Sequence, residues 1–195
     1  MDKMNEMKIE GRDFEKDLKS SQDPLILKEW EIIFKKIWGE DIIIKFQDNK
    51  IAQLEFGTDA TVQQKTGRKF SVEYKTKRYA LKKFNQWPLE IKHHLYLDED
   101  RRYQIKSKEG WLYRSTADYI VFGTLNEEKN KIIEACAITL SPFKDEDFKK
   151  NISKLDARFS YTNDPFVQTT IFKLASTDWL KEHANKFFYF KNGSS

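Results

Sequence analysis

Residues 58–76 carry the pattern that most constrains the fold, because apolar and polar side chains alternate there on both sides of a short turn. The apolar positions are Ala60, Val62, Phe70, Val72 and Tyr74, and the polar ones are Asp59, Thr61, Gln63, Lys69, Ser71, Glu73 and Lys75. A period of two is typical of half-buried strands. Between the two runs, Lys65-Thr66-Gly67 places a glycine at the left-handed position of a three-residue hairpin loop. The pattern therefore predicts a β-hairpin with one apolar and one polar face.

The length of the loop also sets which residues face each other across the predicted hairpin. With a three-residue loop, Gln64 pairs with Arg68, so Asp59 lies directly opposite Glu73. A slip by one residue would move the apolar side chains to the polar face. Directly opposed residues have Cβ atoms about 5 Å apart, close enough for two carboxylates to share one divalent cation. Lys75 follows Glu73 by two positions and therefore projects from the same face.

The acids Asp59 and Glu73 would repel each other at this separation unless a cation lay between them. Mg²⁺ suits such a pair, because it binds a few carboxylates together with waters and substrate phosphate oxygens. A bound metal ion lowers the pKa of its water and polarises a scissile phosphate. The Lys75 ammonium would offset the negative charge that develops. These residues predict metal-dependent hydrolysis of phosphodiesters.

A helix is predicted upstream of the hairpin, over Pro24–Trp38. Asp23 and Pro24 are typical of a helix start, and Gly39 of a helix end. Its apolar positions recur at helical spacing: Leu27, Trp30, Ile33, Phe34, Ile37 and Trp38. Glu31 lies at the edge of this apolar stripe and is slightly better placed than Glu29 to join the two hairpin acids.

The other periodic segments alternate between strands and helices. Strands are predicted at residues 41–46, 89–97, 119–125, 131–140 and 166–174, and helices at 109–117 and 145–155. A closing helix follows, capped by Ser176, Thr177 or Asp178. Because there are no internal repeats or linker-like tracts, we expect a single domain over residues 1–195. Its core would span about 24–125, with a C-terminal elaboration at about 126–190.

Composition narrows the functional classes. Hydrophobic residues make up 39% of the chain, and no apolar run approaches the roughly 20 residues that span a bilayer. Residues 1–20 are too charged for a signal-peptide core, so a soluble, cytoplasmic protein without membrane contact is expected. The single cysteine, Cys136, excludes an intramolecular disulfide and a Cys-rich zinc site. The net charge of +4 is compatible with a nucleic-acid partner.

The motif FGTDA at 56–60 and the later VEYK, with thirteen residues between Asp59 and Glu73, resemble the signature of the PD-(D/E)XK nuclease superfamily, with Thr58 in place of the family's proline. GWLYRSTADYIVF at 110–122 looks most like phage or bacterial resolvase-like and RecB-like nucleases. The resemblance implies an α/β fold whose restriction-endonuclease-like core is a helix, a three-stranded mixed sheet, a helix and a strand, here with a C-terminal α+β extension. It also implies that Asp59, Glu73 and Glu31 bind Mg²⁺ or Mn²⁺ and that Lys75 assists them in catalysis.

The expected substrate of such a protein is DNA, contacted by basic side chains. The residues expected to bind it are Lys77, Arg78, Lys82, Lys83 and Arg114. A Mg²⁺-dependent deoxyribonuclease is therefore expected, an endonuclease being favoured over an exonuclease. Two alternatives stay open. One is a non-catalytic nucleic-acid-binding or protein-interaction module on the same fold, and the other is an accessory protein of unrelated α/β fold.

Two further features have more than one interpretation. Glu90 and Lys92 repeat the acid–lysine spacing within an apolar strand, but no acid at hairpin distance precedes them, so Glu73 and Lys75 are the better candidates. The aromatic run at 187–190 could form the interface of a homodimer. Alternatively, every second member of the run could complete the core.

Overall fold

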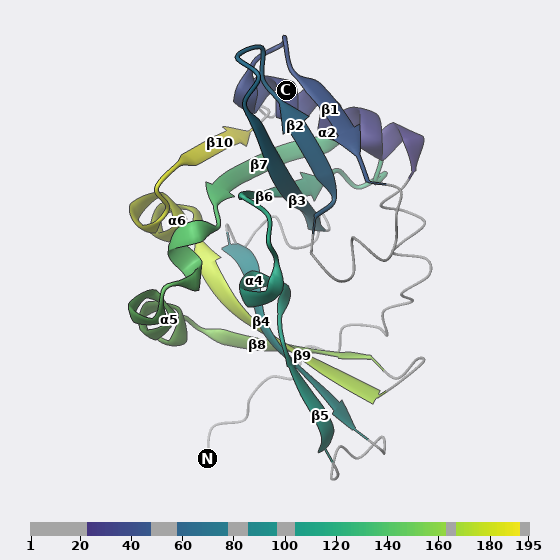
Figure 1. Cartoon of the computed structure of the whole chain (residues 1–195). Helices are drawn as coiled ribbons and strands as arrows, with labels where there is room; N and C mark the ends of the chain where they lie inside the picture. Colours follow the sequence, from purple (N-terminus) through teal and green to yellow (C-terminus); the bar gives the residue numbers. More distant parts are fainter. Residues whose placement is uncertain (1–22, 48–57, 78–85, 97–103, 163–166, 192–195) are drawn as a thin grey trace.

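Two β-sheets with helices around them form the described part of the protein, which is residues 23–47, 58–77, 86–96, 104–162 and 167–191 of a computed structural model (Figure 1). The larger sheet has the order β1 (Ile43–Phe46), β2 (Ala60–Gln63), β3 (Lys69–Lys77), β6 (Tyr119–Leu125), β7 (Ile132–Thr139) and β10 (Phe187–Lys191). It is mixed, because β3 and β6 are parallel whereas the other neighbours are antiparallel. The predicted mixed α/β class is confirmed.

The β2–β3 hairpin has the predicted register. Ala60 pairs with Val72, and Gln64 N donates a hydrogen bond to Arg68 O over 2.9 Å. Gly67 has a φ of 83°, a left-handed conformation that residues with a Cβ rarely adopt. The loop glycine therefore fixes the pairing that separates the apolar face from the polar one.

Helix α2 (Pro24–Trp38) coincides with the predicted helix and covers the apolar face of the hairpin. The Asp23 side chain caps its start by accepting a hydrogen bond from Leu25 N over 2.9 Å. Its buried residues are Ile26, Trp30, Ile33 and Phe34, which pack with the apolar hairpin residues in one core cluster. Burial of each such side chain contributes about 1.5–3 kcal/mol. This packing holds α2 on one side of the larger sheet and leaves the polar face to other elements.

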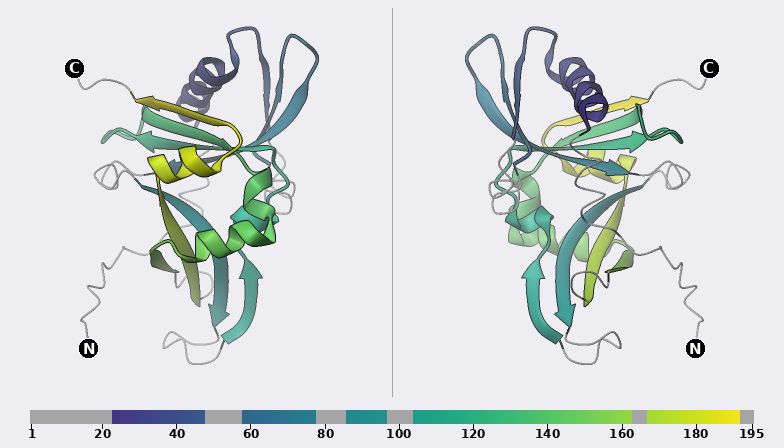
Figure 2. Two further views of the ribbon diagram at one scale, coloured as in Figure 1. Left: turned by 90° about the vertical axis from the view of Figure 1, so that its left-hand side faces the viewer. Right: turned by 90° about the vertical axis from the view of Figure 1, so that its right-hand side faces the viewer.

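The smaller sheet lies below the larger one in the views of Figure 2 and is antiparallel. Its order is β5 (Gln104–Glu109), β4 (Gln86–Tyr96), β9 (Val167–Ser176) and β8 (Ala157–Thr162). A second core cluster joins its upper end to the face of the larger sheet that α2 leaves free. Within this cluster the rings of Trp87 on β4 and Phe122 on β6 are 5.5 Å apart. The polar face of the hairpin thus lies at the junction of the two sheets.

Short helical segments complete the second core cluster. They are α4 (Trp111–Arg114), the 3₁₀ turn η2 (Ser141–Lys144), α5 (Glu146–Ser153) and α6 (Thr177–His183). Leu112, Phe143, Ile152 and Leu180 are their fully buried contributions. The predicted closing helix is confirmed as α6, with Ser176 as its cap through a 3.0 Å hydrogen bond from Trp179 N.

Three strands were not predicted. β5, an exposed edge strand, lacks the apolar alternation that marks a half-buried strand. In β8, Ala157, Phe159 and Tyr161 do alternate with polar residues, so this strand was missed although its pattern was present. The third, β10, contains the aromatic run, and its side chains divide between the two clusters. Phe188 and Phe190 pack on the α2 side, and Phe187 and Tyr189 on the other. Members of the run therefore complete both cores.

Candidate active site at the junction of the sheets

The hairpin brings Asp59, Glu73 and Lys75 together where β2 begins and β3 nears its end. Asp59 N donates a hydrogen bond to Val72 O over 2.9 Å. Tyr74 N donates to Asp59 Oδ2, also over 2.9 Å. Val72 and Tyr74 are the residues on either side of Glu73, so these two bonds keep Asp59 opposite Glu73 and the carboxylates of the two acids close together.

Lys75 closes this group through an ion pair, with Nζ 2.7 Å from Glu73 Oε1. The Lys75 side chain remains 39% exposed, whereas that of Glu73 is 1% exposed. Desolvation lowers the pKa of Lys75, but the charges of Glu73 and Asp59 outweigh it and raise the pKa overall. Lys75 is therefore held as a cation with access to solvent.

Glu73 is buried but only partly satisfied. Its Oε2 has no hydrogen-bond partner within the described part of the chain. The Ser115 hydroxyl lies close to the carboxylate and favours its charged form. Burial raises the pKa of Glu73, the charge of Lys75 opposes this, and the charge of Asp59 adds to it. A buried acceptor without a partner costs about 1–3 kcal/mol, which a ligand on Oε2 would relieve.

Glu90 on β4 belongs to the same group, although the sequence did not place it there. Its side chain is 14% exposed, and its charge is among those that raise the pKa of Lys75. Glu90 Oε1 lies 2.7 Å from His93 Nε2 and accepts a hydrogen bond from Trp111 N over 3.2 Å. The other ring nitrogen, His93 Nδ1, lies 3.0 Å from Thr170 Oγ1. β4 therefore places an acid–histidine pair beside the hairpin site.

A β-bulge explains why Glu90 and His93 meet. The register with β9 shifts between Glu90 and Lys92, which leaves Ile91 as the extra residue. In a regular strand, side chains three positions apart point to opposite faces. No pattern in the sequence marks this bulge, so the position of Glu90 could not be predicted.

The helix glutamates are engaged elsewhere. Glu31 forms an ion pair with Lys35 along α2, with Nζ and Oε1 2.6 Å apart, and is 44% exposed. Glu29 Oε2 accepts a hydrogen bond from Ile132 N over 3.0 Å. Since α2 covers the apolar face of the hairpin, both helix glutamates lie on one side of the sheet and Glu73 lies on the other. The structure does not bring Glu31 to the predicted metal site.

Lys77, expected at a DNA-binding surface, lies in the interior. Its side chain is 3% exposed, and Nζ is 4.1 Å from the centroid of the Trp87 ring and 3.9 Å from Glu134 Oε2. Nζ also donates a hydrogen bond to Gln86 O over 3.2 Å. Burial lowers the pKa of Lys77, and Glu134 opposes this shift. Lys77 therefore ties β3 to β4 and cannot contact a phosphate without leaving the core.

The other expected DNA contacts are only partly described. Arg114 is exposed at the end of α4. Lys106 and Lys108 are exposed on β5, and Lys108 pairs with His93, so its side chain starts from the same face of the smaller sheet. Lys106 shares that face because it is two positions away. The predicted contacts that lie outside the described residues are Arg78, Lys82 and Lys83.

A magnesium ion fits this donor set better than zinc does. Among the described residues, no three His, Cys, Asp or Glu side chains converge closely enough to hold a metal ion. Asp59 and Glu73 provide two carboxylates, one of them with a buried oxygen in want of a partner. Zinc requires three or four protein ligands, whereas Mg²⁺ is often bound by one or two carboxylates with waters and phosphate oxygens.

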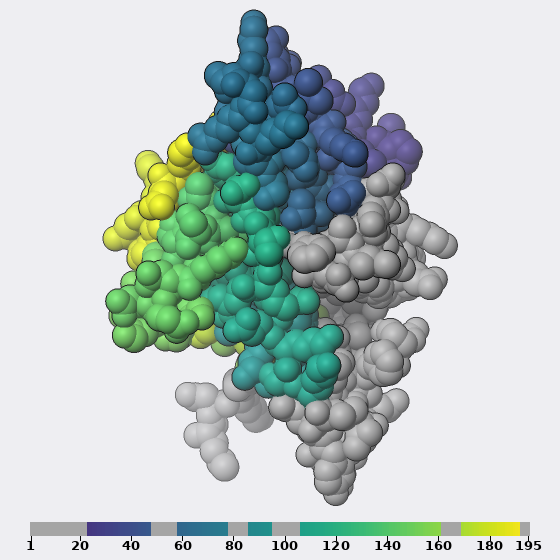
Figure 3. Space-filling model, in the orientation of Figure 1, coloured from purple at the N-terminus to yellow at the C-terminus, as the bar shows by residue number. Residues whose placement is uncertain are grey.

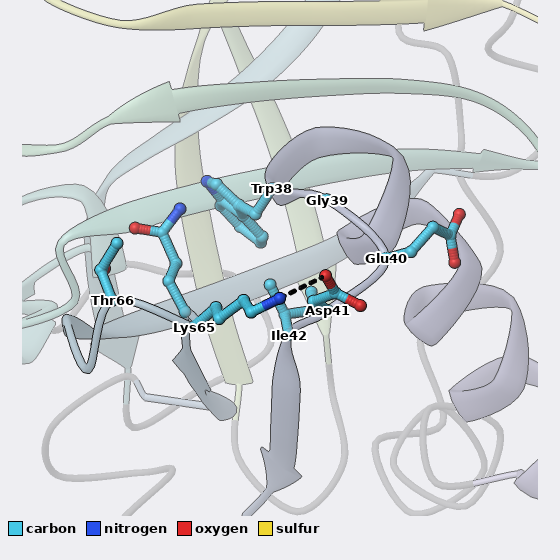
Figure 4. A pocket seen from close by; sticks show the side chains of 8 residues that line it. Trp38, Gly39, Glu40, Asp41, Ile42, Lys65 and Thr66 are labelled. Atoms are coloured by element: carbon cyan, nitrogen blue, oxygen red, sulfur yellow. Dashed lines mark ion pairs between the residues drawn. The ribbon is translucent and has the colours of Figure 1, made fainter.

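A pocket of about 260 Å³ lies at the other end of the hairpin (Figure 4). It is lined by Trp38, Gly39, Glu40, Asp41, Ile42, Gln64, Lys65 and Thr66. Its Lys65–Asp41 ion pair spans 3.7 Å between highly exposed side chains, so it adds little stability. In the space-filling view this end of the hairpin forms the tip of the molecule (Figure 3). The pocket shares no residue with the group around Glu73.

Comparison of the chain with protein-family models, with curated proteins and with solved structures finds no match. None of the helices in the described residues has the length and apolar character needed to cross a membrane.

Proposed function

We propose that this chain is a metal-dependent nuclease that hydrolyses phosphodiester bonds in DNA at a site formed by Asp59, Glu73 and Lys75. One observation carries the proposal: Glu73 Oε2 is buried beside a second carboxylate and finds no hydrogen-bond partner among the described residues. A divalent cation would give this oxygen a partner and offset the repulsion between the two acids.

The order of the structural elements supports the same proposal. The superfamily resemblance implies a helix, three strands, a helix and a strand, and α2, β1 to β3, α4 and β6 follow in that order. β6 lies beside β3 and runs parallel to it. The strands β4 and β5 precede α4, and the elements after β6 form a C-terminal extension. We therefore propose a restriction-endonuclease-like core over residues 24–125.

Each residue of the site has a distinct role in this proposal. Asp59 and Glu73 would hold Mg²⁺ or Mn²⁺, which when bound supplies an acidified water and a polarised phosphate. The hydrogen bond from Tyr74 N keeps the Asp59 carboxylate oriented. Lys75 is exposed enough to turn its ammonium towards a phosphoryl oxygen and to offset negative charge in the transition state.

Exposed basic residues near the site support DNA as the substrate. Lys106 and Lys108 on β5 and Arg114 on α4 are all exposed. Contacts between such side chains and phosphates supply most of the sequence-independent affinity of DNA-binding proteins. In this proposal β5 and α4 replace the buried Lys77 as the positively charged approach to the site.

A non-catalytic nucleic-acid-binding module is the second candidate. The observation that favours it is the 2.7 Å ion pair between Lys75 and Glu73, which places a positive charge on Glu73 without any added cation. In that case DNA binding would be indifferent to metal, and removal of the Asp59 charge would leave it unchanged.

A cleavage assay decides between the two candidates. Linear, single-stranded, branched and closed circular DNA are incubated with the protein and Mg²⁺, Mn²⁺ or EDTA. Asp59→Asn keeps an oxygen for the Tyr74 N hydrogen bond, and Asp41→Asn, at the far end of the hairpin, is the matched control. We expect metal-dependent cutting that falls by about 10²–10³-fold in Asp59→Asn and persists in Asp41→Asn. Binding without cutting of any substrate would favour the module.

A further inference from the structure

Two carboxylates from different sheets, Glu73 and Glu90, act on the charge of Lys75. Glu73 contacts it directly at 2.7 Å. Glu90 is linked to the strand beside Lys75 by Trp111 of α4. Trp111 N donates a hydrogen bond to Glu90 Oε1, and the Trp111 ring packs 5.9 Å from the ring of Phe122. Phe122 is the register partner of Lys75 across β3 and β6. Glu73 thus contacts the Lys75 ammonium, and the Glu90 carboxylate lies near enough for its charge to raise the pKa of Lys75.

Glu90 is a fixed anion. His93 and Trp111 N both contact its Oε1, and Gly110 packs so tightly on the bulge that an added Cβ would lie 2.3 Å from Glu90 O. Burial raises the pKa of Glu90, but the hydrogen bond and charge of His93, together with the charge of Lys75, lower it overall. The roles given above to Asp59, Glu73 and Lys75 make no use of this anion.

Occupation of the acid pair by a cation would disturb Lys75. A divalent ion on Glu73 repels an ammonium 2.7 Å away on the same carboxylate. The Lys75 side chain is 39% exposed, so the displaced ammonium can turn to solvent, and only another anion nearby would hold it within the site. Glu90 does not converge with Asp59 and Glu73 as a third ligand in the described residues, which leaves it free to serve Lys75.

We propose that Glu90 is a positioning residue that receives the Lys75 ammonium when a divalent cation occupies the Asp59–Glu73 pair, an inference that rests on the proposed nuclease site. Lys75 pairs with Glu73 in the absence of the cation and with Glu90 in its presence. The ammonium thereby stays within the site, where it can meet a phosphate, and does not withdraw into solvent.

Calorimetric titration of Mn²⁺ into the full chain, without DNA, tests this exchange. Glu90→Gln keeps an oxygen to accept from Trp111 N but removes the charge. We expect its Mn²⁺ affinity to fall roughly tenfold, the scale of one partly screened charge interaction. Glu90→Asp, which keeps the charge, should recover part of the loss. Glu109→Gln removes a charge from an exposed side chain on neighbouring β5 and should bind Mn²⁺ like the wild type.

A double-mutant cycle separates action through Lys75 from direct attraction of the ion. Lys75→Met removes the competing ammonium, so Mn²⁺ should bind at least as tightly as it does to the wild type. In this background Glu90→Gln should have no further effect. An unchanged affinity in Glu90→Gln alone, or an equal loss in both backgrounds, would overturn the proposal. Thermal unfolding of each variant verifies that it folds. If Glu90→Gln does not fold, Glu90→Asp takes its place in the cycle.

The same titrations distinguish this inference from the nuclease proposal. If the cycle shows coupling but no DNA is cut, the exchange of Lys75 stands and the nuclease activity is refuted. If Asp59→Asn binds Mn²⁺ as well as the wild type does, the acid pair is not the cation site and both proposals fail.

Discussion

Replacement of Glu73 by Gln should stabilise the protein at neutral pH, although Glu73 lies at the centre of the proposed site. The wild-type side chain is 1% exposed and leaves Oε2 without a hydrogen-bond partner in the described residues. A neutral amide is less costly to bury than a carboxylate, and its N–H group can donate to the nearby Ser115 hydroxyl. The variant loses the ion pair with Lys75, but Lys75 is 39% exposed and can be solvated, so this loss is about 0–1 kcal/mol. The net gain should be about 1 kcal/mol, or roughly 2–4 °C in Tm.

The stability difference between Glu73→Gln and the wild type should depend on pH in a defined direction. The folded-state pKa of Glu73 is raised above its ordinary value of 4.5. Below pH 4.5 the carboxyl is protonated in both the folded and the unfolded chain, so its ionisation changes nothing. As the pH rises from 4.5 through the raised pKa, the unfolded chain ionises first and folding becomes less favourable. The stability advantage of Glu73→Gln should therefore be small near pH 4 and largest at pH 8.

Thermal unfolding followed by circular dichroism from pH 4 to pH 8, with EDTA present, measures this difference. Glu109→Gln, which removes an exposed charge, should show no such trend. Addition of Mg²⁺ should raise the Tm of the wild type by binding to its folded state, but not that of Glu73→Gln. If Glu73→Gln is less stable than the wild type at pH 8, or if its advantage is widest in acid, the assignment of Glu73 as a destabilising buried charge is refuted.

Two further predictions concern the elements around the site. Gly110→Ala should lower the free energy of unfolding by about 3 kcal/mol, because its Cβ would lie 2.3 Å from Glu90 O and 2.7 Å from Ile91 C. Gly67→Ala, which meets open space at a φ of 83°, should lower it by only about 1–2 kcal/mol. Equal losses of stability in denaturant unfolding would contradict the close contact at Gly110. Lys106→Glu with Lys108→Glu should weaken DNA binding and reduce the slope of affinity against salt by about 2. The same changes at Lys150 on α5 and at Lys154, its C-cap, should not, and an unchanged slope in the β5 variant would exclude β5 from the DNA path.

The parts of the fold that the sequence predicted are those governed by local pattern. The hairpin register followed from strict alternation and from Gly67, whose left-handed φ leaves one loop geometry. The bounds of α2 followed from Asp23 and Gly39, which cap a helix wherever it packs. The juxtaposition of Asp59 and Glu73 needed only this local information, because a single hairpin contains both residues.

The parts that the sequence could not predict depend on contacts between distant segments. Lys77 shares the polar face with Lys75, yet the packing of Trp87 and Glu134 from other strands draws it into the core. The side-chain alternation of β3 does not distinguish the two lysines, since both occupy polar positions of one strand. Exposure is decided by what covers the face, and the cover comes from residues that follow the hairpin in the chain.

The same reasoning explains why the acid that acts on Lys75 comes from β4 and not from α2. Aromatic side chains hold α2 on the apolar face of the hairpin, so its glutamates start from the wrong side of the sheet. An acid that meets the polar face must come from an element packed on that face, and β4 with α4 fills this place. Their packing also desolvates Glu73, which on an uncovered polar face would be an ordinary solvated carboxylate. The raised pKa of Glu73 and the anion beside Lys75 thus have one structural cause, the docking of the second sheet against the hairpin.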